Sequence, residues 1–395
     1  MQFIDLAAQQ ARLKDKIDAR IQGVLAHGKY ILGPEVAELE EQLSAFCGAK
    51  HSITCANGTD ALLLALMALD IRGGDAVFVP AFTFAATAEV VPCMGAVPVM
   101  VDCDPVTFNM DPESLKRCIT MARQMGLTPK VVIPVDLFGL PADYTAIEPI
   151  ARDEGLTVIA DSAQGFGGRI GNKVTGTFGQ ITTTSFFPAK PLGCYGDGGA
   201  IFTDDDALAE LMISYRFHGK GDYKYDNERI GINSRLGTLQ AAILLEKLAV
   251  YDEEIGSRQR VAERYSSALT ERWTVPTVPG RMLSVWAQYT LKAEDRTARD
   301  AVMARLKEAD IPSVVYYPMP LHQQTAYKAF PTDPEGLAVS EKVAGQVFSL
   351  PMHPYLSEAD QDRVIEVLLA DLAAGVGAMI ALKCSDVLRS FSTVS

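Results

Sequence analysis

The sequence predicts an α/β fold in which helices flank a mostly parallel sheet and a smaller α+β domain follows. Three observations lead to this prediction. The chain has 395 residues, 48% of them hydrophobic, which is enough to bury a large core. Short β-rich runs alternate with amphipathic helical patterns from about residue 50 to residue 215. Beyond a long helical stretch near residue 250, this alternation stops.

The β-rich runs of the first part are short and apolar, as buried strands are. In chain order they are DAVFVP, AVPVMVD, KVVIPVDLFG, LTVIAD, TTTSFF and GAIFTDD. Segments with helical periodicity separate them, for example DPESLKRCITMARQM and YTAIEPIARDEG. Strands and helices that alternate in this way typically form a mostly parallel sheet covered on both faces.

The second part of the chain follows the helical stretch RLGTLQAAILLEKL and reads differently. Its segments VWAQYTLK and EADIPSVVYYP, together with the later helices, predict the smaller α+β domain. We therefore expect a large domain with an N-terminal arm over residues 1–250 and a small domain over residues 251–374. A tail over residues 375–395 remains, whose structure the sequence does not decide.

Composition and charge exclude several classes of protein. The formal net charge of −13 argues against nucleic acid as a partner. The N-terminus lacks the pattern of a signal peptide, and the late apolar run from Leu372 to Leu382 is too short to span a bilayer. We therefore expect a cytoplasmic protein that does not enter a membrane.

Metal sites, disulfides and three enzyme classes are also disfavoured. The seven cysteines form no C-x-x-C pair, and the five histidines show no metal-ligand spacing. The motifs of α/β-hydrolases, P-loop nucleotidases and Rossmann dehydrogenases do not occur. We therefore expect no metal.

The most unusual stretch of the sequence is SFFPAKPLGCYGDGG, residues 185–199. It places Lys190 between Pro188 and Pro191 and follows it with a glycine-rich turn, so the backbone around this lysine is closely restricted. One interpretation is a surface turn with a solvated lysine. The other is a nucleophilic lysine held at a cofactor.

Residues that follow strands are candidates for ligand binding, because ligands of open α/β sheets lie beyond the carboxyl ends of the strands. Asp161 ends the run LTVIAD, and Gln164 follows it. A strand-end aspartate is often only a cap or turn residue, but a buried carboxylate can also hold a pyridine nitrogen protonated. Phe84 follows another strand and is either a core residue or a platform for a flat ligand.

A possible phosphate site lies in CANGTDALLLALMALD. Before a strongly helical run stand Asn57, Gly58, Thr59 and Asp60, where free backbone amides and the Thr59 hydroxyl favour an anion. The alternative is that Thr59 is simply the N-cap of the helix, which needs no ligand.

Seven motifs occur in order along the chain: YILGPEVAELE, NGTDAL, PAFTFAATAE, DSAQGFG, SFFPAKPLGCYGDGGAIFT, INSRLGTLQAAIL and YYPMPLHQQ. With them the sequence resembles the nucleotide-sugar aminotransferases of the DegT type, which depend on pyridoxal 5'-phosphate (PLP). The resemblance runs from FIDLAAQQ to about residue 372. It implies the aspartate-aminotransferase fold, fold type I.

The resemblance also implies roles for the candidate residues. Lys190 would form a Schiff base with the cofactor and move the substrate proton, and Asp161 would pair with the pyridinium nitrogen. Gln164 would contact the ring hydroxyl and Phe84 would stack on the ring. The implied phosphate contacts are Thr59, Asp60, Ser185 and, from the partner subunit, Asn233, and Gly58 would be a further cofactor contact. The protein would then be a homodimer with shared active sites that takes amino groups from L-glutamate, releases 2-oxoglutarate and aminates a keto-sugar nucleotide.

The sugar is less closely defined. The motifs look most similar to enzymes that aminate UDP-2-acetamido-2-deoxy-3-oxo-glucuronate for bacterial surface polysaccharides such as the O-antigen of lipopolysaccharide. Tyr316 stands where related sequences often have histidine, and Asp197 stands where glutamate is commoner. The candidate sugar or anion contacts are Tyr30, Arg216, Arg235, Tyr316 and His322, and each could equally be a structural hydrogen-bonder.

Three alternatives stay open. The acceptor could be a dTDP- or UDP-linked keto-6-deoxy sugar. A PLP-dependent sugar dehydratase can share the fold, but Lys190 argues against it, because a histidine replaces this lysine in such dehydratases. A non-catalytic PLP-binding sensor would not need both Lys190 and Asp161.

Overall fold

The computed structural model describes residues 1–223 and 225–370. Its centre is a seven-stranded sheet with the strand order β1-β9-β8-β5-β4-β2-β3. The strands are β1 (His51–Cys55), β2 (Asp75–Pro80), β3 (Val97–Val101), β4 (Thr128–Val132), β5 (Thr157–Asp161), β8 (Ile181–Ser185) and β9 (Gly199–Thr203). The pairs from β8 to β3 are parallel, and β9 runs antiparallel to both β8 and β1. The predicted fold class, a mostly parallel sheet, is confirmed.

Strand β2 illustrates why the sheet needs helices on both faces. All six of its residues are buried, and its side chains alternate between two hydrophobic clusters. Val77 and Val79 belong to the cluster on one face, and Ala76 and Phe78 belong to the cluster on the other. Because alternate side chains of a strand point to opposite faces, both faces must be covered.

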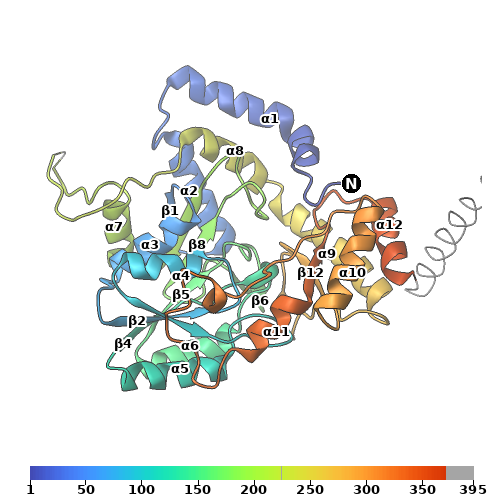
Figure 1. The fold of residues 1–395 in the computed structure, drawn as a ribbon. Helices are drawn as coiled ribbons and strands as arrows, with labels where there is room; N and C mark the ends of the chain where they lie inside the picture. The colour runs from blue at the N-terminus through green and yellow to red at the C-terminus, as the bar shows by residue number, and fades with distance from the viewer. Residues whose placement is uncertain (224, 371–395) are drawn as a thin grey trace, which may run out of the picture.

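Helices supply this cover and form two layers (Figure 1). One layer holds α3 (Gly58–Ala68), α4 (Ala86–Cys93) and α7 (Asp206–Tyr215), which share a core cluster. The other layer holds α5 (Pro112–Gln124) and α6 (Tyr144–Glu154). Near β9, α2 (Pro34–Cys47) packs against α8 (Thr238–Leu248), and α1 (Leu6–His27) lies along α8.

A second group of elements follows α8 and has its own core (Figure 1). The antiparallel pair β11 (Tyr289–Lys292) and β12 (Val347–Leu350) packs with α9 (Tyr251–Leu269), α10 (Arg296–Glu308) and α12 (Glu358–Leu369). Helix α11 (Ala338–Gln346) precedes β12. A three-stranded sheet, β10-β6-β7, joins Met282–Leu283 to Arg169–Ile170 and Lys173–Val174. The domain boundaries stay a prediction, and the expected tail lies outside the described residues.

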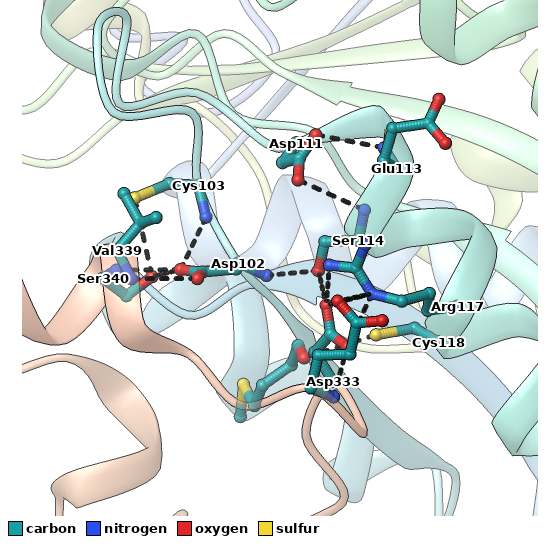
Figure 2. Close-up of polar contacts among 12 residues, drawn as sticks. Asp102, Cys103, Asp111, Glu113, Ser114, Arg117, Cys118, Asp333, Val339 and Ser340 are labelled. Carbon is teal, nitrogen blue, oxygen red and sulfur yellow. Dashed lines mark hydrogen bonds and ion pairs between the residues drawn. The ribbon is translucent and has the colours of Figure 1, made fainter.

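Residues 331–340 attach this second group to the β3 edge of the sheet (Figure 2). The backbone of Met100 in β3 exchanges hydrogen bonds of 2.9 and 3.0 Å with Pro331 and Asp333. The buried carboxylate of Asp333 accepts hydrogen bonds from Ser114 and Arg117 of α5, the shortest Arg117 contact being 2.6 Å. The segment therefore continues the sheet by backbone pairing and is fixed to it by an ion pair.

A second carboxylate completes the attachment. Asp102, directly after β3, accepts hydrogen bonds from the backbone amides of Val339 and Ser340 and from the Ser340 hydroxyl, at 3.0, 2.8 and 2.6 Å. These amides belong to the first turn of α11, so Asp102 satisfies donors that have no partner within the helix (Figure 2). The start of α11 is thereby held at the edge of the sheet.

We predict that Arg117→Ala lowers the free energy of unfolding by about 1–3 kcal/mol, because it leaves the buried Asp333 carboxylate without its cation. The effect is not larger because the guanidinium is partly exposed and solvent screens the ion pair. Lys116→Ala, which removes an exposed ion pair from the same helix, is the control and should change it by less than about 1 kcal/mol. Urea unfolding measures both. Equal effects would contradict the assigned role of Arg117.

The same ion pair predicts a pH dependence. Burial raises the pKa of Asp333, but hydrogen bonds from Arg117 and Ser114 outweigh it and hold the pKa below the ordinary value. A carboxyl with a depressed pKa stabilises the fold above the ordinary value of about 3.9, and this contribution is lost as the pH falls through the lower folded value. The difference in stability between wild type and Asp333→Asn should therefore shrink below about pH 4.

Candidate functional site

A cavity of about 800 Å³ lies at the carboxyl edge of the sheet. Strand ends provide much of its wall: Asp161 ends β5, Ser185 ends β8, and Phe84 follows β2. The predicted site residues that line it are Gly58, Thr59, Asp60, Phe84, Asp161, Gln164, Ser185, Lys190 and Tyr316. The structure thus brings together residues from five of the sequence motifs in a single cavity, where open α/β sheets bind ligands.

The loop that carries Lys190 is held by close contacts. The Lys190 amide donates to the Phe187 carbonyl at 2.8 Å. A Cβ on Gly193 would lie 2.6 Å from the carbonyl oxygens of Phe187 and Pro188, so only glycine allows this chain path. Lys247 of α8, which is buried, donates from Nζ to the Gly193 carbonyl at 2.7 Å. The restricted backbone is therefore part of the cavity wall and not a free surface turn.

Lys190 itself is half-buried, and its surroundings favour the neutral form of its amine. Burial lowers the pKa of its amine, and attraction to Asp161 opposes this shift. A lowered pKa leaves a larger share of the side chain as the neutral amine, which is the nucleophilic form.

Asp161 is a buried carboxylate with a defined orientation and is 5% exposed. Thr87 donates from its hydroxyl to one oxygen at 2.8 Å, and the Ala163 amide donates to the other at 3.2 Å. Burial raises the pKa of Asp161, while these hydrogen bonds and the attraction to Lys190 lower it. The carboxylate is positioned to bind a cationic group inside the cavity.

A second buried carboxyl, that of Asp136, lies next to Asp161 but does not line the cavity. Its amide donates to the Asp161 carbonyl at 3.0 Å, and its carboxyl accepts hydrogen bonds from Ser162, the Ala142 amide and Tyr144. Burial raises the pKa of Asp136 to about 7, and repulsion from Asp161 adds to the rise. Asp136 is not among the candidate residues predicted from the sequence.

The start of α3 differs from the alternative interpretation in which Thr59 caps the helix. Asn57, not Thr59, is the N-cap, because its side-chain oxygen accepts from the Asp60 amide at 2.8 Å. The Thr59 hydroxyl is thus not used for capping, and it lines the cavity together with Ser185. The Asp60 amide is already bonded, so at Asp60 the structure offers no free backbone donor for a phosphate.

Gly58 lets Ser185 approach this helix start. A Cβ built on Gly58 would lie 2.7 Å from the Ser185 Cβ, closer than side chains allow. The helix N-terminus and the two nearby hydroxyls of Thr59 and Ser185 form a region that favours an anion.

Aromatic side chains bound another side of the cavity. Phe84 is 56% exposed, and its ring centroid lies 6.3 Å from that of Tyr317. Gln164 accepts from the Phe138 amide at 2.9 Å and donates to the Tyr317 hydroxyl at 3.0 Å, so both ends of its amide are engaged within the protein. Gln164 thus positions Tyr317 in the cavity wall.

Five predicted residues do not line the cavity: Tyr30, Arg216, Asn233, Arg235 and His322. Arg216 is 7% exposed and bonded to the Glu40 carboxylate and the Thr54 carbonyl, both at 2.6 Å. The expectation of a substrate contact for Arg216 is therefore corrected: burial and the ion pair make it a structural hydrogen-bonder, the alternative that the sequence left open. His322 bonds to Glu341 at 3.0 Å.

Asn233, Arg235 and Tyr30 lie on the outside of the chain. Asn233 is exposed and accepts a hydrogen bond from Arg235, whose guanidinium lies 4.7 Å from the centroid of the Phe217 ring. Tyr30 is 49% exposed. None of these three is among the described residues that line the cavity.

Several lining residues are not among those predicted from the sequence. Thr87 and Tyr317 lie in the motifs PAFTFAATAE and YYPMPLHQQ, so their closeness in sequence to predicted site residues could have identified them. Ile4 and Gln288 also line the cavity, and nothing local in the sequence indicates it. Among the described residues, no group of three or more histidine, cysteine, aspartate or glutamate side chains is placed to hold a metal ion. No helix in the same part of the chain is long and apolar enough to cross a membrane.

Comparison with known proteins identifies the class. The model of the DegT/DnrJ/EryC1/StrS aminotransferase family matches residues 11–369, and the chain belongs to this family. The predicted resemblance and enzyme class are confirmed: the protein is an aminotransferase.

Individual relatives cover almost the whole chain. UDP-2-acetamido-2-deoxy-3-oxo-D-glucuronate aminotransferase of Pseudomonas aeruginosa is 51% identical over 360 residues, 91% of this chain and 97% of the relative. The crystal structure of a DegT/DnrJ/EryC1/StrS aminotransferase from Brucella abortus is 55% identical, has a TM-score of 0.91 and covers 93% of this chain and 98% of that one. A Bacillus subtilis structure with bound cofactor PMP is 32% identical, with a TM-score of 0.84 and coverages of 93% and 84%.

We predict that Gly58→Ala destabilises the fold by about 1–3 kcal/mol, because the new methyl group collides with Ser185 in a packed region. The control is Gly23→Ala in α1, where no atom lies within 4 Å of the added Cβ. Removal of a helical glycine there should stabilise by about 0.5–1 kcal/mol. Urea unfolding measures both, and a neutral Gly58→Ala would contradict the close approach of Ser185.

Proposed function

We propose that this protein transfers the amino group of L-glutamate to a UDP-linked 3-oxo sugar with a carboxylate at C6, using pyridoxal 5'-phosphate. The observation that carries the proposal is a lysine and a buried aspartate in one cavity, in a chain 51% identical to an enzyme named for that sugar. The sugar would be 3-oxo-N-acetylglucosaminuronate. Its product would serve bacterial surface-polysaccharide synthesis, as in the O-antigen of lipopolysaccharide, and the enzyme would act in the cytoplasm.

The residues of the cavity fit this cofactor. Asp161 is a buried carboxylate that suits a protonated pyridine nitrogen. Thr59 at the start of α3 and Ser185 at the end of β8 suit a phosphate, and the exposed ring of Phe84 suits a flat heterocycle. Lys190 provides the amine. A cofactor-bearing relative supports the same assignment.

Lys190 and Asp161 would have different tasks in the reaction. Lys190 would hold the cofactor through its amine and, once displaced by the amino donor, would take the proton from the donor's α-carbon. Its lowered pKa favours the neutral form that both tasks need. Asp161 would keep a proton on the pyridine nitrogen by charge-assisted hydrogen bonding. When bound, the cofactor supplies an electron sink for the electron pair left on the donor carbon.

A homodimer with shared sites belongs to the proposal. Lys190 is the one lysine or arginine among the described residues that line the cavity, yet the acceptor is an anion. A second cation is needed, and Arg235 with Asn233 is available on the outside of the chain. Exposed apolar side chains could be covered by a second copy of the chain. Tyr30 and Ile31 lie next to the Gly237–Thr238 segment that follows Arg235, and Phe187 lines the cavity. We infer that Asn233 and Arg235 serve the partner's cavity.

We predict that Asp161→Ala lowers kcat by several orders of magnitude, because the pyridine nitrogen loses its charged partner and the developing carbanion is poorly stabilised. Asp300→Ala, on an exposed face of α10, is the control and should keep wild-type activity. Steady-state kinetics measure both. A loss of less than about tenfold, or ~1.4 kcal/mol of barrier, would contradict the role of Asp161.

The acceptor is tested by running the reaction backward, which avoids a labile oxo sugar. The enzyme should form glutamate from 2-oxoglutarate and UDP-2-acetamido-3-amino-2,3-dideoxyglucuronate. Candidate UDP- and dTDP-linked amino-6-deoxy sugars should have much lower kcat/KM. If a dTDP-linked amino-6-deoxy sugar were the better donor by a large margin, the alternative acceptor would replace the acidic UDP-sugar, and the aminotransferase class would stand.

A further inference from the structure

The wall of the cavity has two origins. Apart from Asn233, which is assigned to the partner's cavity, the residues assigned to the cofactor lie between Gly58 and Lys190, in the part of the chain that forms the seven-stranded sheet. Other lining residues come from distant segments: Ile4 from the N-terminal arm, Gln288 from the chain just before β11, and Tyr316 and Tyr317 from the segment after α10. The proposed function assigns no role to Ile4 or Gln288.

The N-terminal arm is fixed on both sides of Ile4. The Phe3 carbonyl accepts from the Met352 amide at 3.2 Å, and the Phe3 ring lies 6.3 Å from the Tyr316 ring. On the other side, Asp5 caps α1 by accepting from the Ala8 amide at 2.9 Å. Ile4 is therefore held at the cavity between two anchored neighbours, and a strongly apolar side chain is placed where the sequence shows no local reason for it.

Gln288 has an amide that is not used by the described part of the protein. Its backbone amide donates to the Phe138 carbonyl at 3.3 Å, but its side chain makes no hydrogen bond to any described residue, and its amide oxygen is buried. Gln164, on the same cavity, is by contrast bonded at both ends. A buried polar atom without a partner is costly, so Gln288 is suited to a ligand that offers hydrogen-bonding groups.

We propose that Ile4 and Gln288 are specificity-determining residues for the acceptor sugar. Ile4 packs against an apolar edge of the sugar, such as a C–H face or an acetyl methyl group, and Gln288 exchanges hydrogen bonds with a hydroxyl or amide group. Both side chains are uncharged, which suits the neutral part of an N-acetylated sugar and not the two carboxylates of glutamate. This inference rests on the proposed function, since it deepens the same site.

The test uses the cofactor-loaded enzyme and the variants Ile4→Ala and Gln288→Leu. In the backward reaction each variant should raise the KM for UDP-2-acetamido-3-amino-2,3-dideoxyglucuronate about tenfold, with kcat within about twofold of wild type. Calorimetric binding of UDP-2-acetamido-2-deoxyglucuronate, which cannot react because it has a hydroxyl at C3, should weaken by a similar factor. The rate at which glutamate bleaches the cofactor absorbance should not change.

Two further variants act as controls. Gln2→Ala alters an exposed side chain of the same arm that does not line the cavity, and it should leave all three measurements unchanged. Ile4→Val keeps most of the arm's packing and should weaken sugar binding in the same direction as Ile4→Ala, which separates a sugar contact from a misfolded arm.

The inference is overturned if KM and calorimetric affinity are unchanged in Ile4→Ala and Gln288→Leu, or if the loss falls equally on the glutamate reaction. Failure of the proposed function gives a different result. If the reaction class were wrong, glutamate would not bleach the wild-type protein. If the acceptor were wrong, the wild-type protein itself would neither turn over nor bind the UDP-linked uronates.

Discussion

The placement of the half-buried Lys190 and the buried Asp161 in one cavity is the constraint on which the rest of the site depends. Burial disfavours the charged form of each side chain, and their mutual attraction offsets only part of that effect. The arrangement is useful when an amine must act as a nucleophile and a carboxylate must pair with a bound cation. The cavity is thus built for a cofactor that meets both groups.

The fold holds Lys190 and Asp161 in place although burial disfavours their charged forms. Parallel strands bring Asp161 and Ser185 to one edge of the sheet, and the glycine-rich loop returns Lys190 to the same place. Lys247, on α8, fixes this loop by its hydrogen bond to Gly193. Burial lowers the pKa of Lys247 to about 8, so the lysine that holds the loop is itself in an environment that disfavours its charge. The second group of elements is tied to the sheet by the Asp333 and Asp102 contacts and presents Gln288 and Tyr316 to the cavity.

Local signals carried the predictions that the structure can be compared with. Alternation of strands and helices was sufficient for the fold class, and Lys190 and Asp161, which lie in unusual motifs, line one cavity while their chemical roles stay predictions. It failed where partners are remote: the Glu40 and Thr54 partners that bury Arg216, and the placement of Ile4 and Gln288, arise only from packing. At α3 the N-cap is Asn57, and not Thr59 as in the alternative interpretation of the sequence, because both residue types can cap a helix and only the chain path decides between them.

The most direct test is the absorbance spectrum of the purified protein, reconstituted with pyridoxal phosphate, before and after addition of L-glutamate. The account predicts a yellow wild-type protein whose long-wavelength band is bleached by glutamate and restored by 2-oxoglutarate. Lys190→Ala should show no glutamate turnover, whereas Lys173→Ala, at an exposed lysine of β7, should behave as wild type. A wild-type protein that binds no cofactor, or a Lys190→Ala variant that retains full activity, would contradict the central claim.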